Sequence, residues 1–145
     1  MTATDASALE REVVELHGVI EGWFAGTRPR TAESYAGFAD LLTLDFTSVS
    51  PDGSSSSRDV VVSGLEAAHG AYPGITVEIR WFKFIATSPE LGVARYEEWQ
   101  FHPARTSARL SLVVMRRDAD ARHGWRWLAL HETWLPGAAP ASAQS

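Results

Sequence analysis

The sequence predicts an α+β fold: a cone-shaped barrel in which about three N-terminal helices pack on a curved antiparallel sheet. Apolar residues recur at steps of three and four in the first half of the chain, which is the period of amphipathic helices. After Gly74 the chain instead consists of four long runs rich in β-branched and aromatic residues. Helices grouped ahead of a set of strands are typical of α+β proteins, with the helices on one face of the sheet.

A first, long helix is predicted from Asp5 or Ser7 to Phe24, because its apolar residues fall on one stripe. The stripe consists of Leu9, Val13, Leu16, Val19, Ile20, Trp23 and Phe24. Gly26 and Pro29 end this run, since glycine commonly follows a helix and proline cannot continue one.

Two shorter helices are predicted after it. One follows Thr31, with Tyr35 and Phe38 on its inner face, and the other spans Arg58–Ala71 and stops at Pro73. Both helices need a sheet to lie on.

The first strand is predicted at Leu44–Ser50, before the turn sequence that begins at Pro51. Ser54–Ser57 then either returns as the edge strand of a hairpin or forms a short linker. The long strands are expected at Ile75–Ala86, Gly92–Phe101, Ser107–Arg117 and Trp125–Trp134. Short loops separate these four runs, so we expect neighbouring antiparallel strands.

The length of 145 residues suits one domain, and we expect an ordered core over residues 7–136 and a tail at 137–145 without a pattern. The net charge is −5 and the basic residues are scattered, which argues against nucleic-acid and anionic-membrane partners. The chain has no cysteine, no basic leader and no apolar run of ~18–20 residues. We therefore expect a cytoplasmic protein without a cofactor or metal.

Several features of the chain resemble a known family. They are the order of the elements, the strand around Asp45 before the Pro51 turn, Arg58 at the start of the third helix, and a final strand with His131. Over residues 9–136 the chain resembles the nuclear transport factor 2-like, or cystatin-like, superfamily, which includes SnoaL-like polyketide cyclases, ketosteroid isomerase and scytalone dehydratase. The segments GVARYEEWQF, RTSARLSLVVMRRD and RWLALHETW are also similar to pocket strands of the calcium/calmodulin-dependent kinase association domain. The same cone serves enzymes and non-catalytic modules, so function has to be argued from the site.

The last strand carries a polar pair, His131-Glu132, inside an otherwise apolar run. Side chains alternate along a strand, so we predict that Trp127 and His131 face the pocket and Glu132 faces outward, where it could pair with Arg109 or Arg126. His131 is then either a general acid/base or a structural histidine that ties strands together. If His131 instead points outward, Glu132 takes its place in the pocket.

The adjacent pair Glu97-Glu98 poses the same question, because one of the two must face the cone. The similarity to the kinase association domain implies that Glu97 lies inside with Arg95 and Trp99, and that Glu98 lies outside. Glu97 would then be able to bond His131.

Other polar residues give weaker matches to the enzymes of the superfamily. Asp45 is similar in place to the general base of ketosteroid isomerase. For the oxyanion clamp of that enzyme, Tyr35 lies near the expected region, but the position of the last-strand acid is not evident. A second pocket histidine, as in scytalone dehydratase, is also missing. Arg58 either caps the third helix or reaches a ligand carboxylate at the cone mouth.

We therefore predict a SnoaL-like, cofactor-free isomerase, cyclase or dehydratase that acts on a hydrophobic carbonyl compound, with His131 and Glu97 or Asp45 moving a proton. The predicted ligand-binding residues are Trp23, Tyr35, Arg58, Trp81, Trp99 and Trp127. The alternative is a non-catalytic ligand-binding or oligomerisation module. In either case we expect a homodimer through the convex face of the sheet.

Overall fold

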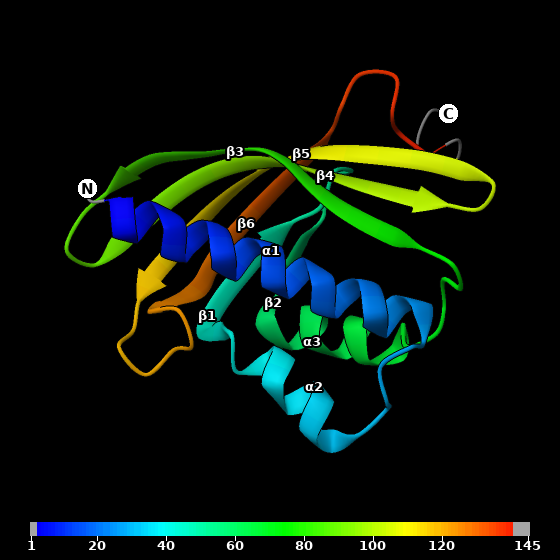
Figure 1. Ribbon diagram of the computed structural model, residues 1–145, viewed down its shortest axis with the longest axis horizontal. Coiled ribbons are helices and arrows are strands. Elements are labelled where there is room, and N and C mark those ends of the chain that lie inside the picture. Colours follow the sequence, from blue (N-terminus) through cyan, green and yellow to red (C-terminus); the bar gives the residue numbers. More distant parts are fainter. Residues whose placement is uncertain (1–2, 141–145) are drawn as a thin grey trace.

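The computed structural model describes residues 3–140 and has three helices and six strands (Figure 1). Their bounds in chain order are α1 (Ala3–Ala25), α2 (Ala32–Ala39), β1 (Leu42–Val49), β2 (Ser55–Ser57), α3 (Arg58–Ala67), β3 (Thr76–Thr87), β4 (Leu91–His102), β5 (Arg105–Arg117) and β6 (Trp125–Trp134). The predicted elements are all present, and the serine run forms the predicted edge strand. Two helix ends differ from the prediction: α1 begins at Ala3, and α3 ends before the turn that contains Gly70, whose φ is 69°.

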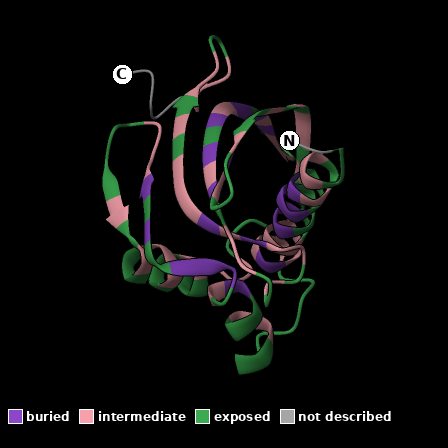
Figure 2. Ribbon diagram, turned by 90° about the vertical axis from the view of Figure 1, so that its left-hand side faces the viewer, coloured by how far each residue is buried: buried purple, intermediate pink, exposed green. Residues whose placement is uncertain are grey.

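The strands form one curved, unclosed sheet in the order β2-β1-β6-β5-β4-β3 (Figure 2). All neighbours are antiparallel except β1 and β6, which are parallel. The prediction of an antiparallel sheet was therefore wrong for this pair, and the sheet is mixed. The strands of this pair are not connected by a hairpin, because α3 and four other strands lie between them in the sequence.

The core lies between α1 and the concave face of the sheet. Trp125, Trp127 and Tyr96 are among the largest fully buried side chains, and Leu9 and Val13 of α1 pack against them. Gly92 of β4 makes this packing possible, because a Cβ atom there would lie 2.9 Å from the Trp125 ring. Glycine thus leaves room for the indole to cross the neighbouring strand.

An ion pair between buried Glu12 and partly exposed Arg122 ties α1 to the β5–β6 loop. The Arg122 guanidinium donates to both carboxylate oxygens of Glu12, at 2.8 and 2.9 Å, and Trp127 Nε1 donates to the same carboxylate at 3.1 Å. Glu12 has no exposed surface, so these three hydrogen bonds replace its lost hydration.

A β-bulge in β6 controls which side chains face the cone. Val114 of β5 pairs with Ala129 whereas the next residue, Met115, pairs with Trp127, so Leu128 is an extra residue without a partner. One extra residue reverses the alternation of side chains. Trp127 therefore faces inward before the bulge, and Leu130 and Glu132 face inward after it.

Within residues 3–140, no helix is both long and apolar enough to cross a membrane.

Candidate functional site

A cavity of about 560 Å³ lies between the helices and the concave face of the sheet, within the usual range of about 300–1,000 Å³ for small-molecule pockets. Its sheet wall is polar and includes Ser48, Glu98, Gln100, Ser107, Arg109 and Glu132. The α3 side contributes only uncharged residues, namely Val60, Val61, Gly64, Leu65 and Ala68. The cavity is thus amphipathic.

His17 of α1 and Glu98 of β4 form a buried ion pair in this cavity. His17 Nε2 lies 2.9 Å from Glu98 Oε1, and His17 Nδ1 lies 2.8 Å from the Val13 carbonyl oxygen. Burial lowers the pKa of His17, but the charge and hydrogen bond of Glu98 outweigh it and raise that pKa above its ordinary value. Burial also opposes ionisation of Glu98, yet His17 brings the pKa of Glu98 down to about 2. The second Glu98 oxygen accepts a hydrogen bond from Gln100 at 2.6 Å, so this carboxylate is fully engaged.

Glu132 is less constrained. Its Oε1 atom lies 3.5 Å from Arg109 Nη1, which is longer than the ~2.7–2.9 Å of a charge-assisted hydrogen bond. Burial and then the charge of Glu98 raise the pKa of Glu132 to about 7, although Arg109 and His17 oppose the rise. Near neutral pH this carboxyl group is therefore present in both protonation states, as a group that gives and takes protons must be.

Two buried hydroxyl groups lie beside this site on the sheet. The register pairs Tyr96 with Ser111 and Ser111 with Glu132, and neither hydroxyl has a hydrogen-bond partner among the described residues. Residues 3–140 contain no cluster of three or more histidine or carboxylate side chains arranged to hold a metal ion.

The predicted inward orientations of His131 and Glu97 are wrong. His131 is exposed and lies on the outer face, because the Leu128 bulge reverses the alternation of β6 before it. Glu97 accepts a hydrogen bond from Trp99 Nε1 at 2.9 Å and takes no part in the cavity, whereas Glu98 is buried within it. The conditional prediction that Glu132 would then face the pocket agrees with the structure, and Glu132 does pair with Arg109, but inside the cone.

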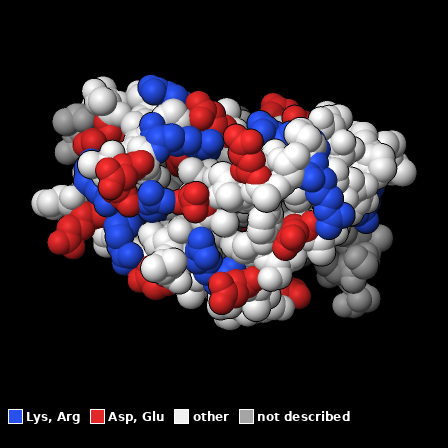
Figure 3. Space-filling view, turned by 90° about the horizontal axis from the view of Figure 1, so that it is seen from below, with Lys and Arg blue, Asp and Glu red and all other residues white. Residues whose placement is uncertain are grey.

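Asp45 and Arg58 line a separate, charged hollow away from this cavity. Asp45 is exposed and accepts two hydrogen bonds from Arg116, at 3.0 and 3.2 Å, which lower the pKa of Asp45. Arg58 donates to the Ala39 carbonyl oxygen at 2.8 Å. Neither residue reaches Glu132, so the structure does not bring the predicted proton-transfer groups together. On the face in Figure 3 basic and acidic side chains are intermixed, without a large patch of one sign.

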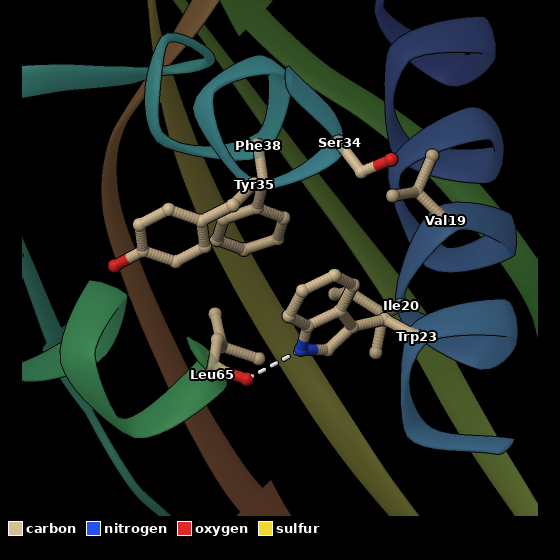
Figure 4. Close-up of a pocket in the computed structure, with 7 residues that line it drawn as sticks. All are labelled: Val19, Ile20, Trp23, Ser34, Tyr35, Phe38 and Leu65. Atoms are coloured by element: carbon tan, nitrogen blue, oxygen red, sulfur yellow. Dashed lines mark hydrogen bonds between the residues drawn. The ribbon is translucent and has the colours of Figure 1, made fainter. Parts of the chain in front are cut away.

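Trp23 and Tyr35 lie in a crevice between the helices instead of the main cavity (Figure 4). Trp23 Nε1 donates to the Leu65 carbonyl oxygen at 2.5 Å, and the Tyr35 hydroxyl donates to that of Val62 at 3.0 Å. The crevice holds only about 10 Å³, about the space of a single water molecule. Both aromatic residues therefore fix α3 in place.

The three other predicted tryptophans have different environments. Trp127 lines the cavity, as predicted. Trp99 lies on the outer face, where the Arg80 guanidinium stacks 4.5 Å from its ring centroid. Trp81 is 79% exposed and has a φ of 55°, at an irregularity in the pairing of β3 with β4.

The cavity residues that the sequence predictions missed are His17, Glu98 in its inward position, and Arg109 as a cavity residue. His17 had a usable signal, since it lies four residues after Val13 on the apolar stripe of α1. A polar side chain on the buried face of a helix needs a partner, and here the partner is Glu98.

No protein-family model and no curated protein matches the chain, but many solved structures do. An NTF-2 like protein of unknown function from Pseudomonas aeruginosa is 28% identical, with a TM-score of 0.81 and coverage of 88% of this chain and 98% of that chain. ActVI-ORFA from Streptomyces coelicolor is 18% identical, with a TM-score of 0.56 and coverage of 87% and 96%. A candidate calcium/calmodulin-dependent protein kinase type II association domain from Thiobacillus denitrificans is 19% identical, with a TM-score of 0.57 and coverage of 81% and 92%.

The similarity covers most of this chain and nearly all of the Pseudomonas aeruginosa protein, so it concerns the whole fold. The resemblance predicted from the sequence is thereby confirmed, and the chain has the α+β fold of the nuclear transport factor 2-like superfamily.

Proposed function

We propose that this protein catalyses cofactor-free proton transfer on a small hydrophobic carbonyl compound, as an isomerase, cyclase or dehydratase does, with Glu132 as the acid/base group. One observation carries the proposal: Glu132 is a largely buried carboxyl group, with its side chain 12% exposed, that faces the cavity and has a pKa of about 7. Such a group is efficient in both directions of proton transfer near neutral pH, and contributes roughly 10²–10⁴-fold to a rate.

In this mechanism the Glu132 carboxylate removes a proton from the carbon beside the carbonyl group, and returns it to a second carbon or to a leaving oxygen. Negative charge develops on the carbonyl oxygen in between. The positive charges of Arg109 and His17, both in the cavity wall, stabilise that oxygen in a site partly shielded from water. His17 and Glu98 bond each other, so they act on Glu132 through their charges.

The proposal is tested by deuterium exchange into a panel of cyclic ketones and β-diketones in D₂O, followed by proton NMR. We expect the wild-type protein to accelerate exchange over buffer, and Glu132→Gln to lose at least about 10²-fold of that acceleration. His131→Gln is the matched control, because His131 lies on the outer face of the same strand and should leave the rate unchanged. Exchange that is equal in wild type and Glu132→Gln would overturn the proposal.

The non-catalytic alternative has its own supporting observation. The outer face of the sheet carries the apolar side chains Trp99, Leu110, Leu112 and Val114, and Leu112 is 40% exposed. An unpaired apolar sheet face favours self-association, and one similar structure is described as a candidate association domain. We propose a homodimer through this face, whether or not the cavity is catalytic.

Sedimentation equilibrium tests the dimer. We expect a dimer mass for the wild type and a monomer mass for Leu112→Asp, since a charge in the centre of an apolar interface is unpaired. Ser54→Asp, on the exposed turn before β2, is the control and should stay dimeric. A monomer mass of the wild type at all concentrations would exclude this interface.

A further inference from the structure

The Arg109 guanidinium is bound more weakly than those of Arg122 and Arg116. Arg122 and Arg116 each form two short hydrogen bonds to one carboxylate, Glu12 and Asp45 respectively. Arg109 has only the 3.5 Å contact of Nη1 with Glu132, and its buried Nε has no hydrogen-bond partner among the described residues. The Arg109 side chain is 17% exposed, and its buried Nε donor costs free energy because its lost hydration is not replaced.

The Arg109 side chain is also held in place. On β5, Arg109 pairs with Glu98 of β4 on one side and with Trp134 of β6 on the other. The Arg109 guanidinium carbon lies 4.8 Å from the centroid of the Trp134 ring. The aromatic ring covers the guanidinium without using its N–H donors, and Arg109 lines the cavity. The site therefore has an oriented cation whose fork is available to a ligand.

The charges around Arg109 favour an anion. His17 has both ring nitrogens next to atoms that only accept hydrogen bonds, the Val13 carbonyl oxygen and the Glu98 carboxylate, so both nitrogens carry a proton. The positive charges of His17 and Arg109 thus face the one ionised carboxylate of Glu98 whenever Glu132 is protonated. Arg105 at the cavity wall adds a further positive group, and the α3 side contributes none of either sign.

We infer that the ligand of this cavity carries a carboxylate group, which binds the Arg109 guanidinium, and an apolar body, which lies against α3. This inference rests on the proposed function where it concerns a substrate, and it names the substrate class as apolar carbonyl compounds that are also carboxylic acids. A carboxylate bound by Arg109 would lie next to Glu132, which is 3.5 Å from the same guanidinium. The carbon that bears the exchangeable proton is then close to the carboxyl group that removes it.

The probes are straight-chain and aryl carboxylates of graded length, each paired with its primary amide, and binding is measured by isothermal titration calorimetry. A carboxylate and its amide have nearly the same shape, so the ratio of their affinities reports the anionic group alone. We expect at least one carboxylate to bind about tenfold or more tightly than its amide, as a charge-assisted, two-point hydrogen bond implies.

Two arginine variants locate the effect. Arg109→Gln should reduce the carboxylate affinity to that of the amide, and Arg109→Lys should keep part of the preference, because it keeps the charge but not the fork. Arg116→Gln, which alters an arginine outside the cavity, should bind as the wild type does. The circular dichroism spectrum of each variant shows whether it is folded.

The inference is overturned if no carboxylate binds more tightly than its amide, or if Arg116→Gln loses the preference as fully as Arg109→Gln. These results are distinguishable from a failure of the proposed function. A preference for carboxylates without deuterium exchange supports this ligand class and rejects the proposed catalysis. Exchange into neutral ketones without a preference for carboxylates supports the catalysis and rejects this ligand class.

Discussion

Replacement of Glu132 by glutamine should make the protein more stable in alkali. The carboxyl group of Glu132 has an ordinary pKa near 4.5 and a pKa of about 7 in the folded protein. Between these two pH values the folded state binds more protons than the unfolded state, so the free energy of unfolding falls as the pH rises. At about 1.4 kcal/mol per pKa unit, the loss is about 3 kcal/mol once the pH is well above 7. Glutamine keeps the shape of the protonated acid but never ionises.

The measurement is urea unfolding at pH 5, 7 and 9, followed by tryptophan fluorescence. We expect Glu132→Gln and wild type to have similar free energies of unfolding at pH 5, and the variant to be the more stable by about 3 kcal/mol at pH 9. The charges of His17 and Glu132 also act on each other's pKa, so the difference between the two curves reports Glu132 together with its interaction with His17.

Glu78→Gln is the control, because Glu78 is an exposed carboxylate that pairs with Arg80 on the surface. Its pH dependence between pH 5 and 9 should match that of the wild type. Parallel curves for wild type and Glu132→Gln would refute the assignment of Glu132 as a buried acid, and with it the proposed mechanism.

Three further experiments test other contacts of the structure. Glu98→Gln removes the negative charge that keeps His17 protonated, so the pKa of His17 should fall below its ordinary value of 6.5. NMR titration of the His17 ring measures this pKa, and an unchanged value would contradict the ion pair. Glu12→Gln should cost about 2–3 kcal/mol in urea unfolding, because it breaks buried, charge-assisted hydrogen bonds to Arg122. Glu15→Gln, next to it on an exposed site, should cost less than about 1 kcal/mol, and equal costs would argue against a buried role for Glu12. In thermal unfolding, Trp81→Gly should be about 1 kcal/mol more stable than Trp81→Ala, because glycine adopts the positive φ of residue 81 without strain. An alanine variant more stable than the glycine variant would contradict that backbone conformation.

Most of the fold could be predicted from the sequence, because each element has a local periodicity. The stripe of α1 and the four long strands are examples, and the short loops between the strands identify their antiparallel order. The parallel contact of β1 with β6 could not be predicted in this way. This contact joins segments about 80 residues apart in the sequence, and no local pattern indicates which strand pairs with the edge of β6 that β5 does not occupy.

The candidate site was predicted less well, because its residues depend on strand parity. The sequence correctly limits the polar groups to Glu97 or Glu98 and to His131 or Glu132, since one of each pair must face the cone. The choice within each pair was wrong. In β6 the cause is Leu128, whose bulge has no glycine, proline or other local signal in the sequence.

The bulge at Leu128 means that the chemistry of the cavity depends on how β6 pairs with β5 as well as on the identity of its residues. If β6 were regular at Leu128 with all its residues kept, a continuous alternation from Trp127 would turn His131 into the cavity and Glu132 out of it. Deletion of Leu128 would instead remove the bulge and leave Glu132 inward, so loss of the bulge without loss of a residue is the change by which such a cone can exchange a carboxylic acid for an imidazole. Comparisons of related chains should therefore align β6 by its pairing with β5, since a gap placed one position away assigns the wrong side chain to the cavity.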